Sequence, residues 1–342
     1  MQVMITCSQG YVGTVVAQEL SAAGHEVTGF DRASSRGVSW GRERRTPPRL
    51  ASNIRDVTTA DLTGFDAVIH LATLSPLPDN LDVSRVAHQI NYLAAIRLAK
   101  APREAGVARL IVASACLPHA RADRTRVGES APDHPLSSCA PAGAGVEKQV
   151  VALADSSFVP VLLRLADIFG ASPKYRSDTL LNRMVGVTVA RGEISVAENG
   201  NARRSMVHVL DVADALLRCL AATAEFIRGT VLDVGSKTTT VSQADIASAV
   251  RDEIPGATVN STGPVTSDPV ACPTDFGAVH RILGFRATRG IADGVAEIHR
   301  LYAHAGVPAD DLNSRFCRES QLRRIRSTGE IDVQARRVEK MP

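Results

Sequence analysis

Aromatic residues are scarce in this chain of 342 residues, where Phe, Trp and Tyr together make 4%, with one Trp and four Tyr. A large all-β sandwich draws on aromatic and β-branched side chains, and a surface that binds single-stranded nucleic acid stacks bases on aromatic rings. Both classes are therefore disfavoured. The four tyrosines also allow any proposed catalytic tyrosine to be checked position by position.

The sequence also lacks a strong excess of either charge, since 39 Lys and Arg stand against 36 Asp and Glu, a formal net charge of +3. A nucleic-acid-binding face needs a concentrated basic stripe. Six arginines lie between positions 32 and 49, and eight basic residues against four acids lie in 313–342. Solvated loops and a tail account for both clusters, so we expect no nucleic-acid partner.

The six cysteines include no Cys-x-x-Cys pair and no closely spaced Cys/His set, which disfavours a metal site and a disulfide framework. No apolar run approaches the roughly 18 residues of a membrane span. The N-terminus enters a strand pattern directly, without a charged leader. These absences predict a soluble cytoplasmic protein with no membrane partner.

Hydrophobic residues make 44% of the chain, enough for one large α/β unit or two joined domains. The predicted strands are 3–6, 26–30, 67–71, 109–114, 159–165, 205–209 and 230–234, and helices are predicted at 14–23, 84–105, 143–153 and 212–224. After 241 we expect a helix, a loop rich in Pro, Thr and Ser, and a final amphipathic helix. This alternation predicts an α/β fold with a Rossmann-like, doubly wound parallel sheet.

A glycine motif from Thr6 to Gly13 follows the first predicted strand, and the second predicted strand leads into Asp31. Glycines let the backbone approach a pyrophosphate, a helix N-terminus holds its charge, and an acid about 20 residues on binds the ribose hydroxyls. A carboxylate at Asp31 repels a ribose 2′-phosphate and so favours NAD. Arg32 and Arg36 follow it and leave NADP open.

From Gln2 to about Tyr302 the sequence resembles the extended short-chain dehydrogenase/reductase family, in particular its NAD-dependent epimerases and dehydratases of nucleotide sugars. The family's Thr-Gly-x-x-Gly-x-x-Gly corresponds to residues 6–13, with Cys7 in place of the first Gly. Its acidic-aliphatic pair near the adenine falls on Asn53 and Ile54, with Asn in place of Asp. Further stretches that match family motifs are 70–73, 91, 164–170, 204–213 and 283–285.

This resemblance implies a set of ligand contacts. Those implied for the cofactor are Thr6, Ser8, Gln9, Gly10, Tyr11, Val12, Gly13, Asp31, Arg32, Asn53, Ile54, Leu71, Ala72, Thr73, Asn91 and Asp167. Those implied for the substrate are Cys116, His119, Asn182 and Arg204. Arg204 would face a diphosphate, which suits a guanidinium, although a surface salt bridge explains it equally well. For His208 we favour a packed strand residue.

The resemblance also implies the domain organisation. Residues 1–165 plus 205–240 would form the NAD(P)-binding domain, and 166–204 plus 241–312 a smaller C-terminal α/β substrate domain. Residues 313–342 would form a basic tail. A homodimer is expected, paired through the helices that carry Asn91 and Cys139.

The family's catalytic pair is Tyr-x-x-x-Lys on a helix, preceded by a Ser or Thr at the end of a strand. Ser114 matches the hydroxyl position. When the helix is aligned on Glu147, the Tyr and Lys positions fall on Cys139 and Gly143. The residues four places after the four tyrosines are Val15, Ile96, Thr179 and Gly306, so the sequence contains no Tyr-x-x-x-Lys.

Replacement groups are few. Lys148 lies five residues beyond Gly143, roughly 140° around a helix and about 7.5 Å along it, and so would point elsewhere. The open candidates for an acid or base are Cys139, Cys116, His119, Asp167 and an ordered water, and packing or loop roles explain each of these residues better. Ala115 and Cys116 stand where the 4,6-dehydratases carry Asp-Glu, which disfavours their elimination chemistry.

The sequence therefore predicts an atypical NAD(P)-dependent oxidoreductase or epimerase. Its substrate would be a nucleotide sugar or a sugar-bearing secondary metabolite, and its catalysis would depend mainly on positioning. Two alternatives stay open. One is a ketoreductase that tailors a natural product, by analogy with antibiotic-pathway ketoreductases that lack the family tyrosine, and the other is an inactive NAD-binding sensor or scaffold.

Overall fold

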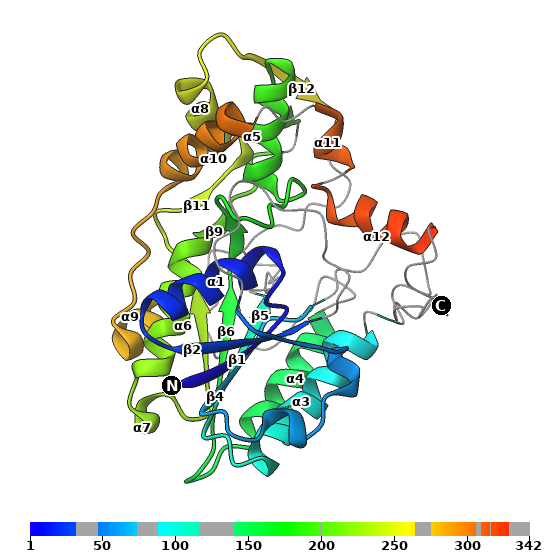
Figure 1. The fold of residues 1–342 in the computed structure, drawn as a ribbon. Helices are drawn as coiled ribbons and strands as arrows, with labels where there is room; N and C mark the ends of the chain where they lie inside the picture. Colours follow the sequence, from blue (N-terminus) through cyan, green and yellow to red (C-terminus); the bar gives the residue numbers. More distant parts are fainter. Residues whose placement is uncertain are drawn as a thin grey trace.

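Seven parallel strands form the central sheet of the computed structural model, in the order β10-β6-β5-β4-β1-β2-β3 (Figure 1). Their bounds are β1 (Gln2–Thr6), β2 (Glu26–Asp31), β3 (Arg49–Ala51), β4 (Ala67–His70), β5 (Arg109–Ala115), β6 (Val159–Leu165) and β10 (Thr230–Val234). The structure describes residues 1–31, 47–73, 86, 88–115, 140–198, 200–263, 275–305, 309–314 and 316–327. The strand order reverses between β1 and β4, where doubly wound sheets bind ligands. The predicted fold class is confirmed.

Helices cover both faces of this sheet (Figure 1). On one face lie α1 (Tyr11–Ala22), α6 (Val209–Ala221), α7 (Ala224–Ile227) and α9 (Gly277–Leu283). On the other lie the π-helical segment η4 (Gln89–Ala94), α3 (Ala95–Glu104) and α4 (Ala140–Val151). Within β1, Val3 and Ile5 pack on the first face and Met4 on the second. Burial on both faces explains why these strands are nearly continuous apolar runs.

A second core lies beyond the carboxyl ends of the strands, at the top of Figure 1. It is built from α5 (Leu180–Arg191), α8 (Gln243–Glu253) and α10 (Ile291–Ala305), next to the parallel pair β8 (Glu193–Ala197) and β12 (Thr258–Thr262). Strand β12 begins the stretch expected to be a loop. All five of its residues are exposed, so it carries no alternating pattern of burial to predict it from.

The strand expected at 205–209 does not join the large sheet. It is β9 (Arg204–His208), which pairs with β7 (Asp167–Phe169) and β11 (Thr240–Val241) in a small separate sheet. Its side chains alternate between two cores, because Met206 packs in the second core with α5, α8 and α10, and Val207 packs in the core under α6. This small sheet therefore joins the two parts of the molecule.

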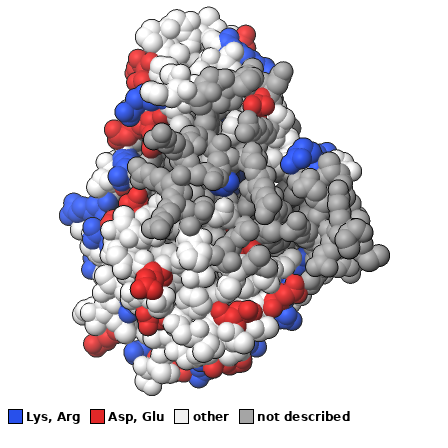
Figure 2. Space-filling model, in the orientation of Figure 1, with Lys and Arg blue, Asp and Glu red and all other residues white. Residues whose placement is uncertain are grey.

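The second core extends beyond position 312, although we expected a basic tail to begin at 313. Phe316 is buried against Tyr175, with ring centroids 6.1 Å apart, and its carbonyl accepts a hydrogen bond from the Ser177 N–H. The helices α11 (Ala309–Asn313) and α12 (Arg318–Ser327) flank it. Basic and acidic residues are interspersed over the described part of the face shown in Figure 2. No helix within the described ranges is long and apolar enough to span a membrane.

Candidate active site

The turn after β1 keeps a dinucleotide-binding shape despite the substitution at Cys7. Cys7 has a φ of 58°, and it is the only non-glycine with positive φ among the described residues. This conformation costs an ordinary residue roughly 1–2 kcal/mol. A Cβ added at Gly13 would lie 2.1 Å from the Cys7 carbonyl oxygen, and one at Gly10 would lie 2.8 Å from the Cys7 Sγ. A side chain at Gly13 would clash with the backbone of the turn, and one at Gly10 would crowd Cys7.

Helix α1 presents its N-terminus at this turn. Among the described residues no side chain caps it, and its first turn contains no acid, which leaves its first N–H groups available to an anion. The Gln9 N–H donates to Asp31 Oδ2 at 2.8 Å, which holds that carboxylate beside the turn at the end of β2. A helix end without an acid and an adjacent carboxylate fit the pyrophosphate and a ribose of NAD. The structure thus brings Gln9, Gly10, Gly13 and Asp31 together as predicted.

A buried polar pair lies at the switch point between β1 and β4. Thr6 Oγ1 accepts the N–H groups of Leu71 and Ala72 at 3.0 and 3.2 Å and lies 2.9 Å from His70 Nδ1. Because its lone pairs serve the two amides, the hydroxyl donates its own proton to His70. Burial lowers the pKa of His70 to about 4, so the ring is neutral. This pair fixes the predicted cofactor loop, which ends at the exposed Thr73.

Asn53, at the position where the family has an acidic residue, caps a short helical turn. Its Oδ1 accepts from the backbone N–H and from the Nε of Arg55, both at 3.1 Å, and so caps the short turn η2 (Ile54–Asp56). Arg55 reaches on to Gln89 Oε1 at 3.1 Å. Ile54 is buried beside them. Only the amide nitrogen of Asn53 is left to meet a ligand.

Strand β5 carries the predicted Ser114 hydroxyl, and a buried ion pair joins the neighbouring strand β6 to α4. Ser114 is partly buried near the carboxyl end of β5, in register with Arg164. Arg164 pairs with Glu147 of α4, Nε to Oε1 at 3.0 Å and Nη2 to Oε2 at 2.6 Å, and both side chains are 9% exposed. This pair ties α4 to the sheet. Lys148 is exposed, as its helical position predicts.

Several predicted positions lie outside the described residues: Arg32, Cys116, His119 and Cys139. The others are described. Asn91 lies in η4 and is partly buried, as are Val12 and the loop residues Leu71 and Ala72, and Ser8 is buried in the turn.

All four tyrosines are described, and none of them is followed by a Lys four residues later. Tyr11, Tyr175 and Tyr302 are at most 7% exposed. Tyr92 is partly buried, with its ring beside Gly145 of α4 and its hydroxyl accepting from Gln149 Nε2 at 2.9 Å. Gly145 and Gln149 lie two and six residues after Gly143, so this phenol contacts α4 on the C-terminal side of Gly143.

Two residues that were predicted to contact ligands, Arg204 and Asp167, form an ion pair. Arg204 Nε lies 2.9 Å from Asp167 Oδ2, and these side chains are 25% and 51% exposed. Arg204 thus forms a salt bridge, and its contact with a diphosphate stays a prediction. Asn182, in contrast, is fully buried, with its Oδ1 accepting the Gly170 N–H and its Nδ2 donating to the Arg176 carbonyl. These hydrogen bonds tie its side chain to residues 170 and 176, and its contact with a substrate stays a prediction.

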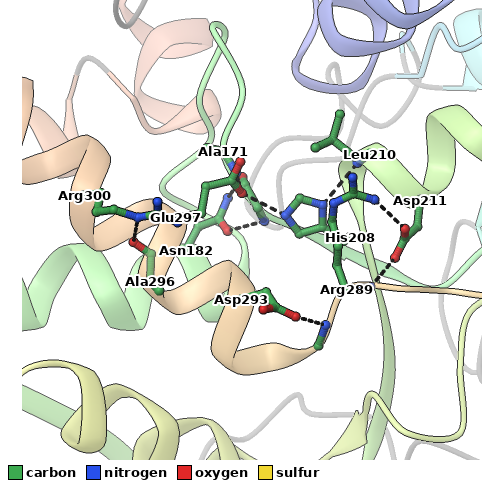
Figure 3. Close-up of polar contacts among 12 residues, drawn as sticks. Ala171, Asn182, His208, Leu210, Asp211, Arg289, Asp293, Ala296, Glu297 and Arg300 are labelled. Carbon is green, nitrogen blue, oxygen red and sulfur yellow. Dashed lines mark hydrogen bonds and ion pairs between the residues drawn. The ribbon is translucent and has the colours of Figure 1, made fainter.

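Figure 3 shows a pair that sequence analysis missed, His208 with Glu297 of α10. His208 Nδ1 accepts the Leu210 N–H, so Nε2 carries the proton and donates to Glu297 Oε2 at 2.8 Å. The Ala171 N–H donates to the same oxygen at 3.0 Å. Burial acts to raise the pKa of Glu297, but these hydrogen bonds outweigh it and hold that pKa below its ordinary value. His208 is buried, as expected, and its partner lies 89 residues away.

No group of three His, Cys, Asp or Glu side chains within the described ranges is arranged to hold a metal ion. The described groups that could take part in binding or catalysis are the glycine turn at 6–13, the Asp31 carboxylate, the Ser114 hydroxyl and the Arg204–Asp167 pair.

The sequence model of the NAD dependent epimerase/dehydratase family matches residues 3–235. This chain belongs to the NAD-dependent epimerase/dehydratase family. Family membership makes it an enzyme of the extended short-chain dehydrogenase/reductase type, with NAD as the cofactor. A UDP-glucose 4-epimerase of Corynebacterium glutamicum is 24% identical over 63% of this chain and 69% of its own length. That of Bacillus subtilis is 22% identical over 88% and 96%.

Solved structures share the fold. TunA, an NAD-dependent NDP-hexosamine 5,6-dehydratase involved in tunicamycin biosynthesis, superposes with a TM-score of 0.78 at 24% identity, over 91% of this chain and 99% of its own. MoeE5, solved in complex with UDP-glucose and NAD, gives 0.76 at 23% identity, over 90% and 100%. At these identities the likeness concerns the fold.

Proposed function

We propose that this family member catalyses hydride transfer on a nucleotide sugar, as an epimerase or oxidoreductase, without the Tyr–Lys pair. One observation carries the proposal: the turn after β1 holds Asp31 beside the N-terminus of α1, and Ser114 lies near the carboxyl end of β5, in a sequence that contains no Tyr-x-x-x-Lys. The relatives named as UDP-glucose 4-epimerases support the substrate class.

NAD, when bound, supplies the hydride acceptor and donor. The chain's own residues would hold it in place, with the α1 N-terminus on the pyrophosphate and Asp31 on a ribose. Ser114 would hydrogen-bond the substrate oxygen. Without a positioned acid and base, the proton of that oxygen would pass to solvent water when the sugar is oxidised and return from water when it is reduced. General acid–base catalysis contributes about 10²–10⁴-fold, so we expect turnover slower than that of the Tyr–Lys relatives by about that factor.

Arg204 is the proposed contact for the substrate diphosphate. A guanidinium fork suits phosphate oxygens, and the exposed Asp167 keeps the fork oriented until a ligand competes for it. We expect Arg204→Ala to weaken UDP binding about tenfold, measured by calorimetry. The matched control is Arg203→Ala, because the neighbouring Arg203 pairs with Asp245 instead. Equal weakening by both variants would contradict the assignment.

The direct test of the function is to incubate the pure protein with NAD and a panel of UDP- and dTDP-sugars. The nicotinamide absorbance and proton NMR of the sugars would be followed. We expect slow conversion of at least one sugar. Tight NAD binding with no conversion across the panel would overturn the proposal in favour of a non-catalytic NAD-binding protein.

A further inference from the structure

Tyr11 connects the cofactor turn to the substrate side. It opens helix α1, and its side chain is 7% exposed. Its hydroxyl donates to the Gly170 carbonyl at 2.7 Å and accepts from Asn182 Nδ2 at 3.3 Å. Its own carbonyl accepts from Ser172 Oγ at 2.7 Å. The three hydrogen bonds therefore join Tyr11 to residues 159, 161 and 171 positions later in the chain.

Residues 170–172 form hydrogen bonds with residues of α1, α5 and α10. The Gly170 N–H donates to Asn182 of α5, and the Ala171 N–H donates to Glu297 of α10, which His208 in turn fixes (Figure 3). Gly170 has a φ of 109°, and a Cβ there would lie 2.4 Å from His208 Nε2, so only glycine fits. Residues 170–172 are thus a packed junction between α1, α5 and α10.

This junction directly follows β7, which carries Asp167. Asp167 orients Arg204 through the ion pair at 2.9 Å. One short path of bonded groups therefore runs from the N-terminus of α1, through the Tyr11 hydroxyl and Gly170, to the charged pair on the substrate side. Burial raises the pKa of Tyr11 well above its ordinary range, so the hydroxyl stays protonated and keeps donating.

We infer that Tyr11 is a positioning residue that couples NAD binding to the order of the substrate side. Its backbone belongs to the helix end that would hold the pyrophosphate, and its ring holds residues 170–172. A ligand that fixes the first turn of α1 restricts the ring and hence the junction, and by linkage an ordered substrate side strengthens NAD binding. The inference needs NAD binding alone and does not depend on which sugar is bound.

Hydrogen exchange of the whole protein, with and without NAD, tests this coupling. We compare the wild type with Tyr11→Phe. The control is Tyr302→Phe, because that buried phenol packs on Tyr175 from α10, with ring centroids 5.9 Å apart, and so tests whether loss of any phenol beside this segment removes the slowing. In the wild type and the control, NAD should slow exchange of peptides spanning 168–176 about fivefold or more. In Tyr11→Phe that slowing should vanish, while the Kd for NAD rises by less than about tenfold.

Retention of the NAD-induced slowing in Tyr11→Phe would overturn the coupling, even if exchange there is faster in both states, because that result describes a purely structural role. Absence of slowing in the wild type with NAD bound would also overturn it. If Tyr11→Phe does not fold, Ser172→Ala replaces it, since this variant removes the Ser172 bond and keeps the phenol. We then expect partial loss of the slowing, and an unchanged effect would refute the coupling. A wild type that binds no NAD would overturn the cofactor assignment as well.

Discussion

The carboxyl ends of β1 and β5 lie in one sheet, with only β4 between them, and they differ in what they preserve. At the end of β1 the proposed NAD contacts come from the main chain, and the turn holds Cys7 at a φ of 58° where the family has glycine. At the end of β5 the expected chemistry depends on one phenol, and no tyrosine is there. A site made of backbone geometry survives a change of side chain, whereas a site made of side chains does not.

The largest expected effect concerns the anchor that remains at the β5 side. Glu147→Ala leaves the Arg164 guanidinium buried and unpaired, so we expect the free energy of unfolding to fall by about 3–5 kcal/mol in urea denaturation. The control is Asp214→Ala, which removes an exposed partner of Arg218 and should cost at most about 1 kcal/mol. Similar losses in both variants would show that the buried pair is not an anchor.

Gly13→Ala tests the backbone side of the comparison. The new Cβ would lie 2.1 Å from the Cys7 carbonyl oxygen, so we expect about 3 kcal/mol of destabilisation and loss of NAD binding. Gly24→Ala is the matched control, because Gly24 has a φ of 86° with no heavy atom within 4 Å of an added Cβ. It should cost roughly 1–2 kcal/mol and leave NAD binding intact. Unchanged NAD affinity in Gly13→Ala would contradict the turn's assigned role.

His70 gives the cofactor side a dependence on pH. Its pKa is about 4 in the folded protein and 6.5 in the reference state, so the unfolded chain takes up the proton first as the pH falls. Stability present above pH 6.5 is therefore lost toward pH 4, by up to about 3 kcal/mol. His70→Asn should lack this loss. Denaturation of both proteins at several pH values measures the difference, and parallel curves would refute it.

Asp31→Asn should affect the cofactor and not the fold. The amide oxygen can still accept the Gln9 N–H, but the charge that binds the ribose hydroxyls is gone. We expect NAD affinity to fall about tenfold by calorimetry, with unchanged thermal stability. The preference for NAD over NADP should narrow at the same time. A wild type that binds NADP more tightly than NAD would contradict the role given to this carboxylate.

The smallest effect is expected from Cys139→Ala. Cys139 occupies the family's tyrosine position in the sequence, but a thiol there is shorter than a phenol by several ångströms, so we expect less than about a threefold change in kcat. Single-substrate kinetics on the best sugar of the panel would measure it. A drop of hundredfold would make this thiol the missing acid.

The sheet was predictable because its strands carry strong local signals. Strand β6 has the predicted bounds 159–165, and β1 and β2 differ from prediction by one residue each. Buried parallel strands are apolar throughout, and a glycine turn with a following helix is a local motif.

The rest depends on contacts that local patterns do not encode. The pairing of β9 with β7 and β11 and the core position of Phe316 arise from packing between distant segments. The contacts of Glu297 with His208 and of Tyr11 with Gly170 join residues 89 and 159 positions apart. The sequence indicated only that His208 is a polar residue in a strand, and it gave no sign of its partner Glu297.

Turnover without a catalytic phenol is tested most directly by comparing the wild type with Tyr92→Phe, because Tyr92 is the one tyrosine that is not buried. Both proteins would be assayed with NAD and the preferred nucleotide sugar by proton NMR. We predict conversion by the wild type and a rate for Tyr92→Phe within about threefold of it. Loss of hundredfold or more in Tyr92→Phe, with NAD binding intact, would show that a phenol still transfers the proton.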